Sequence, residues 1–168
     1  WRDAVELKLG TVDEPGGFAM VAYDREFLYV AATCPRKPGA DIVLPAASDR
    51  QHDADVAAQD RLIFAVGGDG GYAAWYEFQV DERGETHDRC WEETRWNPKW
   101  FVAVTGDDTA WRMEVAIPWE PLTPTPPEPR QAWGFSLVRV TPGVGVDGWD
   151  GPSAWPLRGI DFGLLRFE

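Results

Sequence analysis

The sequence predicts an all-β protein: a two-layer antiparallel β-sandwich of the immunoglobulin or jelly-roll kind. The first observation is an alternation of apolar and polar residues, which is the period-two pattern of half-buried strands. In the segment Trp111–Ile117 the apolar residues fall on one face, while Arg112 and Glu114 fall on the other. The segment Ala22–Val30 alternates in a similar way. The second observation is that clusters of Gly, Pro and Asp separate such segments, and no sustained helical period occurs.

Five strands are predicted in the first half of the chain. Pro15–Gly17 is a breaker between the first two, and the glycine run Gly67–Gly71 precedes the fifth. That run lacks the Gly-Lys-Ser/Thr ending of a phosphate-binding loop, and no helix follows it, so it indicates a hairpin turn. Pro35–Ala58 is a long irregular loop rich in aspartate, and loops of this length are either functional or disordered. The five predicted strands are Ala4–Leu9, Phe18–Tyr23, Phe27–Thr33, Asp60–Val66 and Tyr72–Asp81.

Four further strands are predicted in the second half. Asp81–Gly84 and Gly106–Asp108 are turn signals that precede the first two of them. Pro118 removes a donor from the strand ladder and ends its strand, so the next residue begins a corner. Leu122–Pro129 is rich in proline and indicates an extended polyproline II connector. The four predicted strands are Phe101–Thr105, Trp111–Ile117, Trp133–Val140 and Gly163–Phe167.

Two residues near that corner are expected to be structural. Trp119 should fill the corner, because large aromatic side chains of this kind are mostly buried. Glu114 should anchor a loop or a basic partner such as Arg139 on the outer face of the sandwich.

Composition sets bounds on the number of domains and on the partners. The 168 residues predict one domain, residues 1–168, and the start at Trp1 without a Met indicates a piece of a longer protein with covalently linked neighbouring domains. The 16 basic and 28 acidic residues give a net charge of −12, which argues against nucleic acid and anionic membrane surfaces as partners. No apolar run is long enough for membrane insertion.

Aromatic residues and cysteines give weaker signals. The ten tryptophans favour sugar binding, because indole rings offer flat faces for sugar rings, although any single tryptophan more often fills a core. Cys34 and Cys90 form no C-x-x-C pair, and two buried free thiols are favoured over a disulfide. Zinc is disfavoured, because His52 and His87 bracket no compact set of ligands.

A series of short motifs follows along almost the whole chain. They are Trp1-x-x-Ala4, Val21–Asp24 with Leu28–Val30, Gln59-Asp60 before an apolar strand, Phe78-x-Val80 with Gly84, Glu114–Trp119, Gly134-Phe135 with Arg139, and Ala154–Pro156 with Phe162-Gly163-x-Leu165. Their order and spacing resemble carbohydrate-binding module family 9. The resemblance implies a β-sandwich, usually appended to a secreted glycoside hydrolase or a cell-surface protein, and therefore a secreted, periplasmic or cell-surface location.

The resemblance also implies a ligand and a metal. Family members bind an oligosaccharide or polysaccharide chain end between two Trp rings and use structural calcium, with no organic cofactor. Here Ala57 stands at one stacking position and Ile63 replaces a family Glu. Gln79 and Asp81 correspond to an Arg and an Asn that contact sugar hydroxyls, while Trp155 keeps the second stacking ring. Weak or altered binding of plant or bacterial polysaccharide is therefore expected.

Strand parity offers a replacement for the missing ring. Because side chains alternate across a strand, Tyr76, Phe78 and Val80 should point to the core. The intervening residues should then line the opposite face, or else form a solvated face with one exposed Trp. The segment Arg89–Trp100 adds three Trp, and packing along a structural edge is favoured over a place beside the ligand. The predicted ligand-binding residues are Trp155, Trp75, Glu77, Gln79 and Asp81.

Calcium is favoured by acidic clusters in loops. The Asp-x-Asp pattern at residues 53–55 lacks the full twelve-residue calcium loop, and it is also common in plain surface loops. The candidate ligands are Asp53, Asp55, Asp147 and Asp150.

Three alternative functions remain open. A b-type haem electron-transfer sandwich would need axial ligands from residues such as Met20, Met113, His52 or His87, but Met113 shares its face with core residues. A glycosidase would need a pair of carboxylates across a cleft, and the family resemblance places no such pair here, so no enzyme is expected. A structural or interaction spacer with a vestigial sugar site is the remaining alternative.

Overall fold

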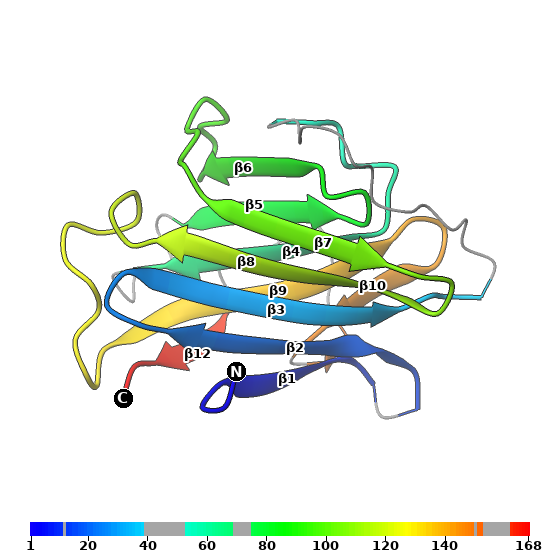
Figure 1. Cartoon of the computed structure of the whole chain (residues 1–168), viewed down its shortest axis with the longest axis horizontal. Coiled ribbons are helices and arrows are strands. Elements are labelled where there is room, and N and C mark those ends of the chain that lie inside the picture. The colour runs from blue at the N-terminus through cyan, green and yellow to red at the C-terminus, as the bar shows by residue number, and fades with distance from the viewer. Residues whose placement is uncertain (12, 39–52, 69–74, 150, 153–161) are drawn as a thin grey trace.

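Two antiparallel β-sheets pack face to face in the computed structural model of the chain (Figure 1). The structure describes residues 1–11, 13–38, 53–68, 75–149, 151–152 and 162–168, and it contains no helix among them. Neighbouring strands in both sheets run antiparallel, as their registers show. The predicted all-β, two-layer antiparallel sandwich is therefore confirmed.

The first sheet has five strands in the order β1-β2-β3-β8-β7. Its central pair is long, because β3 and β8 are in register from Phe27 opposite Pro118 to Pro35 opposite Ala110. Each of its strands was predicted from the sequence, with ends that differ by a few residues. The bounds are β1 Val5–Gly10, β2 Pro15–Tyr23, β3 Phe27–Pro35, β7 Phe101–Gly106 and β8 Ala110–Pro118.

The second sheet has seven strands in the order β11-β10-β9-β4-β5-β6, with β12 also paired to β9. Four of its strands were predicted, whereas β6, β10 and β11 were not. Residues 72–74 of the predicted fifth strand lie outside the described part of the chain. The bounds are β4 Arg61–Gly67, β5 Tyr76–Asp81, β6 Thr86–Cys90, β9 Ala132–Thr141, β10 Gly145–Gly148, β11 Gly151–Pro152 and β12 Gly163–Arg166.

The core lies between the two sheets and is rich in aromatic rings. The alternate residues of β8 that begin with Trp111 are all buried, as their parity predicted. Across the core, Phe64 and Phe78 stack with ring centroids 5.3 Å apart, and Trp100 meets both of them edge-on. Large buried rings of this kind contribute strongly to stability, because each removes a large apolar area from water.

The residues expected to be structural at the corner have different partners. Trp119 is buried, its Nε1 donates to the carbonyl of Asp24 at 2.9 Å, and its ring packs edge-on against Trp133. Its corner role is confirmed. Glu114 instead lies exposed on the five-stranded sheet, where it accepts a hydrogen bond from the indole of Trp1. The predicted pairing of Glu114 with Arg139 is wrong.

Arg139 pairs elsewhere because β9 belongs to the other sheet and directs this side chain into the interior. It is fully buried and forms an ion pair with Asp60, the residue that precedes β4. A buried guanidinium needs such a carboxylate, since an isolated charge would be costly to remove from water.

Both cysteines are free thiols, as favoured from the sequence. Cys34 is completely buried on β3, and this burial raises the pKa of its thiol to about 12. Cys90 lies half-buried at the end of β6. Within the described ranges, no helix is long and apolar enough to cross a membrane.

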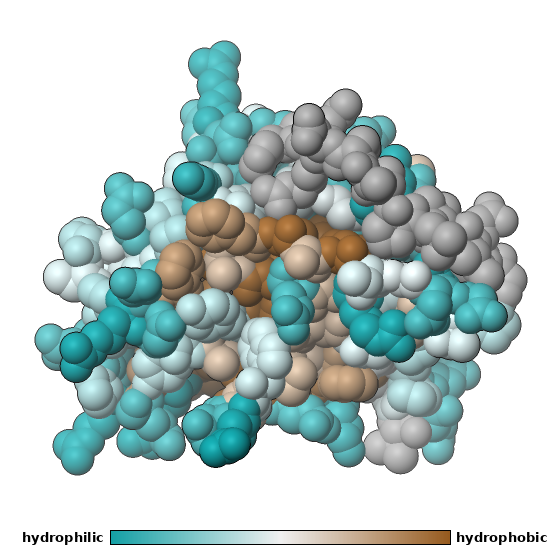
Figure 2. Space-filling model, in the orientation of Figure 1, coloured by the Kyte–Doolittle hydropathy of each residue, from teal (hydrophilic) through white to brown (hydrophobic). Residues whose placement is uncertain are grey.

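The outer face of the five-stranded sheet is turned toward the viewer in Figures 1 and 2. Apolar colour gathers over the middle of this face, and hydrophilic residues surround it. Exposed apolar side chains on this sheet include Phe18 and Phe101, and Trp1 also lies exposed. The face carries a contiguous apolar area of a kind that often marks an interaction surface.

Candidate functional site

The candidate site lies on the outer face of the seven-stranded sheet, opposite the core. Phe78 and Val80 are buried in the core and Tyr76 packs against it, as predicted. The intervening residues of β5 therefore point to the outer face. There a small apolar cluster of Ile63, Ala65 and Val138 lies beneath Trp75 and other partly buried side chains. Strand parity thus located this face correctly.

Glu77 and Gln79 form a connected polar group on this face. Glu77 is fully buried, and its carboxylate accepts from Gln79 Nε2 at 2.9 Å and from Arg89 Nη2 at 2.7 Å. The register explains the second contact, because Arg89 of β6 stands directly opposite Glu77. The Arg89 side chain is 28% exposed, so the charged group that reaches the surface here is the guanidinium.

Asp81 stabilises the hairpin between β5 and β6. Its Oδ1 accepts from the backbone amides of Arg83 and Glu85, at 2.9 and 3.0 Å. Its Oδ2 accepts from the guanidinium of Arg83, and the Asp81 side chain is fully buried. Gly84 adopts φ 91°, a left-handed conformation that glycine adopts at little cost, and so closes the turn. Asp81 therefore lies on the predicted face with its carboxylate engaged inside the protein.

An aromatic pair borders the polar group at the other end of β5. Trp75 and Trp91 stack with centroids 6.4 Å apart and planes inclined by 19°. The backbone amide of Trp91 donates to the carbonyl of Trp75 at 2.8 Å, which fixes the two residues side by side. Trp91 is 47% exposed, and Phe162 packs against the Trp75 ring at 5.8 Å.

Trp91 was not among the ligand-binding residues predicted from the sequence. It belongs to the segment Arg89–Trp100, whose favoured role was a structural edge. That interpretation holds for Trp100, which is buried and donates to Asp88 at 2.9 Å, and for Trp96, which packs against the core. It does not hold for Trp91, which has a φ of 54° in the turn after β6 and whose side chain is exposed.

Among the described residues, two donors at this site are buried without a hydrogen-bond partner. They are Nε1 of Trp75 and Nε of Arg89. An unpaired buried N–H group is costly, because it has lost its bond to water and gained none from the protein.

The remaining predicted residues are dispersed or not described. Trp155 and Asp150 lie outside the described residues. Asp55 accepts from the amide of Ala57 at 3.1 Å, and Asp147 pairs with Lys37 at 3.0 Å. Asp53 has φ 55° in the loop before β4. The described portion of the chain holds no group of three or more His, Cys, Asp or Glu side chains that could bind a metal.

The described residues do not bring the haem-ligand candidates together. Met113 is buried between the sheets, whereas His87 lies opposite Gln79 on the outer side of the seven-stranded sheet. Met20 lies on β2 of the other sheet, and His52 is outside the described residues. The haem alternative is therefore not favoured.

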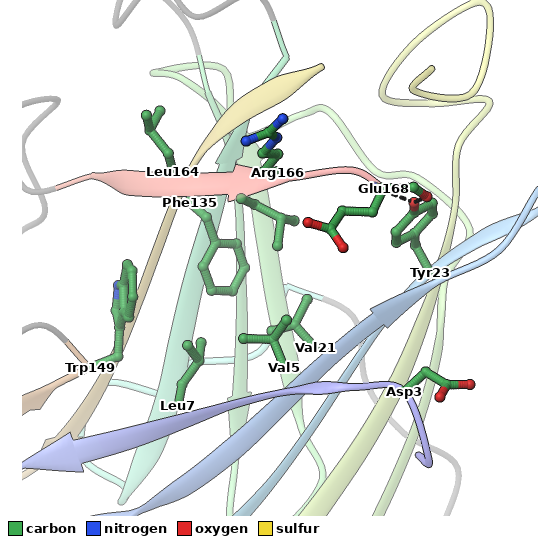
Figure 3. Close-up of a pocket in the computed structure, with 11 residues that line it drawn as sticks. Asp3, Val5, Leu7, Val21, Tyr23, Phe135, Trp149, Leu164, Arg166 and Glu168 are labelled. Carbon is green, nitrogen blue, oxygen red and sulfur yellow. Dashed lines mark hydrogen bonds between the residues drawn. The ribbon is translucent and has the colours of Figure 1, made fainter. Parts of the chain in front are cut away.

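A separate cavity of about 370 Å³ opens between β1, β2 and β12 (Figure 3). Its lining is mainly apolar, with Leu7, Val21 and Phe135 on the floor and Trp149 at one end. Tyr23 closes the other end, where its hydroxyl accepts from the amide of Glu168 at 2.8 Å. None of the predicted ligand-binding residues lines this cavity.

Comparison with known proteins adds a fold relationship. No protein-family model matches the chain, and no curated protein matches its sequence. Among solved structures, a proposed carbohydrate-binding protein from Bacteroides uniformis superposes with a TM-score of 0.71 at 14% identity, covering 99% of this chain and 88% of the other.

Two further structures are of a family 9 carbohydrate-binding module from Caldicellulosiruptor kristjanssonii. The complex with cellotriose has a TM-score of 0.67, and the complex with glucose has 0.66; both are 13% identical. Each superposition covers all of this chain, and 84% and 86% of the respective modules. The chain therefore has the β-sandwich fold of the family 9 carbohydrate-binding modules, as the order of its motifs indicated.

Proposed function

We propose that this protein is a non-catalytic carbohydrate-binding module whose site lies on the outer face of the seven-stranded sheet. The observation that carries the proposal is the stacked Trp75–Trp91 pair beside the Arg89–Glu77 ion pair. Sugar sites combine an aromatic face with fixed polar groups, because stacking alone cannot read the orientation of hydroxyl groups. The similar fold of modules solved with cellotriose and glucose supports the proposal.

Each residue has a distinct role in this proposal. Trp91 offers the exposed ring, and Trp75 supports it from below by stacking. Arg89 donates to sugar hydroxyls, and Glu77 holds the guanidinium in place with the help of Gln79. Asp81 fixes the hairpin that carries Arg89.

Trp155 completes the proposed site as the second stacking ring, at the position that the family resemblance assigns to it. Few polar side chains of the site are exposed, so the binding is expected to be weak. The partner is an oligosaccharide or polysaccharide, and the module acts outside the cell or at its surface beside linked domains. Structural calcium remains a prediction of the family resemblance.

A glycan array tests the ligand class directly. The chain should bind one or more plant or bacterial polysaccharides, and it should release no sugar from any glycan on prolonged incubation. Trp91→Ala should weaken this binding. Leu164→Ala, which truncates an exposed apolar residue on β12 outside the site, should bind as the wild type does. Absence of binding to every glycan would favour the spacer alternative, and release of sugar would contradict the non-catalytic role.

A further inference from the structure

The outer face of the five-stranded sheet carries a second group of aromatic side chains. Trp1 and Tyr29 meet edge-to-face at 6.4 Å, Tyr29 and Phe27 lie 5.8 Å apart, and Phe27 and Phe101 lie 6.1 Å apart. Trp1 is 44% exposed and Phe101 is 48% exposed. These four rings, termed the second aromatic surface, are on the opposite side of the molecule from Trp75 and Trp91.

The register sets the spacing of the aromatic residues on this face. One row across four strands reads Ala22, Tyr29, Ala116 and Phe101, so that small and aromatic residues alternate. Strands lie about 4.8 Å apart, and so the backbones of Tyr29 and Phe101 are separated by about 10 Å with an alanine between them. An extended β-linked glycan places alternate sugar rings at a comparable spacing.

Trp1 is held in place on this face by a side chain from the middle of the sheet. Its Nε1 donates to Glu114 Oε1 at 3.0 Å, and Glu114 is flanked by Ala31 and Ala103 in the neighbouring strands. The hydrogen bond fixes the indole and leaves Oε2 of Glu114 as an acceptor beside the rings. A ring fixed before binding loses little conformational entropy when a ligand stacks on it.

The charges of this face match an uncharged ligand. The protein has a net charge of −12, yet the outward charged residues of these strands are two acidic and two basic, namely Glu6, Glu114, Lys8 and Arg112. Asp24 accepts from the hydroxyl of Tyr29 at 2.8 Å and adds an acceptor at the edge of the rings. A balanced set of charged groups neither attracts a charged polymer nor repels a neutral one, and its carboxylates accept bonds from hydroxyl donors.

Together, these features lead us to propose that the second aromatic surface, with Glu114, is a second carbohydrate-binding site that takes a neutral, extended polysaccharide chain. Figure 2 shows the apolar patch over the middle of this face. The inference rests on the proposed function only in its ligand class, because no residue is shared between the two sites. A module with sites on both faces binds two segments of polysaccharide at once, which raises its affinity for the polymer above that for short oligosaccharides.

The test separates the two sites by substitution. Binding to soluble neutral polysaccharides would be measured by affinity gel electrophoresis for the wild type, Trp91→Ala, Phe101→Ala and the double variant. We expect each single variant to bind about ten-fold more weakly through loss of avidity, and the double variant to lose binding. Leu164→Ala is the matched control, because it also removes an exposed apolar side chain but lies outside both sites. Glu114→Ala should weaken binding and alter the fluorescence of Trp1.

The other possible binding results would refute one of the two sites or both. If Trp91→Ala alone abolishes binding and Phe101→Ala binds as the wild type does, the second site is refuted while the proposed function stands. If Phe101→Ala abolishes binding and Trp91→Ala has no effect, the proposed site is refuted and the second one stands. If the wild type binds no polysaccharide, both fail. A dimer in sedimentation that Phe101→Ala dissociates, with no change in sugar binding, would refute the second site as well.

Discussion

Arg139 and Asp60 form a two-point ion pair inside the sandwich: Arg139 Nε donates to Asp60 Oδ1 at 2.9 Å, and Nη2 donates to Oδ2. The same carboxylate accepts from Trp111 Nε1 at 3.0 Å, and Arg139 Nη1 donates to the carbonyl of Gly16 at 2.6 Å. Trp111 and Gly16 belong to the five-stranded sheet, whereas Arg139 belongs to the seven-stranded one. The ion pair therefore connects the two layers through the core.

Removal of one partner of this pair should strongly destabilise the protein. Asp60→Asn would leave the Arg139 guanidinium buried without a countercharge, and such changes typically cost about 3–5 kcal/mol of unfolding free energy. Urea denaturation would measure the loss. Arg112→Gln is the matched control, because its ion pair with Asp107 lies at the surface, where such pairs contribute little to stability. Equal stabilities of the two variants would show that the buried pair does not connect the layers energetically.

Trp119→Ala should also lower the melting temperature substantially. The ring is buried, packs against Trp133 and Phe167, and donates to the carbonyl of Asp24, so its removal leaves a cavity and an unpaired acceptor. Truncation of a buried aromatic residue costs about 3–5 kcal/mol. Differential scanning calorimetry would measure the change. An unchanged melting temperature would contradict the corner-packing role.

The thiol of Cys34 should be unreactive in the folded protein and should make stability fall at high pH. Burial raises the pKa of this thiol to about 12 from its ordinary value of 9.0. The folded state therefore keeps its proton where the unfolded state loses it, so stability is fully present below about pH 9 and declines as the pH rises toward 12. Denaturation at pH 8, 9 and 10 would show the decline, and Cys34→Ala should reduce it.

A thiol reagent gives an independent test of the same group. At pH 8, Cys90 should react first, because it is only half-buried, and Cys34 should react at the rate of unfolding. Rapid labelling of Cys34 without denaturant would contradict its burial.

The strands that the sequence revealed are those with an apolar face toward the core. Alternation identified β3 and β8 directly, because every second residue is apolar. Alternation failed for β6, because its core-facing residues include the polar Thr86 and Asp88. The buried carboxylate of Asp88 accepts a hydrogen bond from Trp100. A strand with polar residues on both faces has no apolar alternation to detect. The short, glycine-containing β10 and β11 lack a sufficient pattern for the same reason.

The sequence also predicted the candidate site only in part. Strand parity placed Glu77, Gln79 and Asp81 on the outer face, because the face to which a side chain points depends only on its position along the strand. The partners of those carboxylates depend on pairing between strands: Arg89 is opposite Glu77 through the register of β5 and β6. Trp91 could not be selected, because its stacking on Trp75 joins residues that are 16 positions apart and has no local sequence signal. Pairs such as Asp60 and Arg139, far apart in sequence, have no local signal either.

Carbohydrate binding on the outer face of the seven-stranded sheet is the function proposed for this chain. The most direct measurement is calorimetric titration of the wild type, Trp91→Ala, Trp75→Ala and Trp155→Ala with cello-, xylo- and manno-oligosaccharides. The wild type should bind at least one series weakly. This binding should be lost in Trp91→Ala and Trp155→Ala and reduced in Trp75→Ala, while each variant stays folded. Binding by all three variants as tight as that of the wild type, or no binding of any series by the wild type, would contradict it.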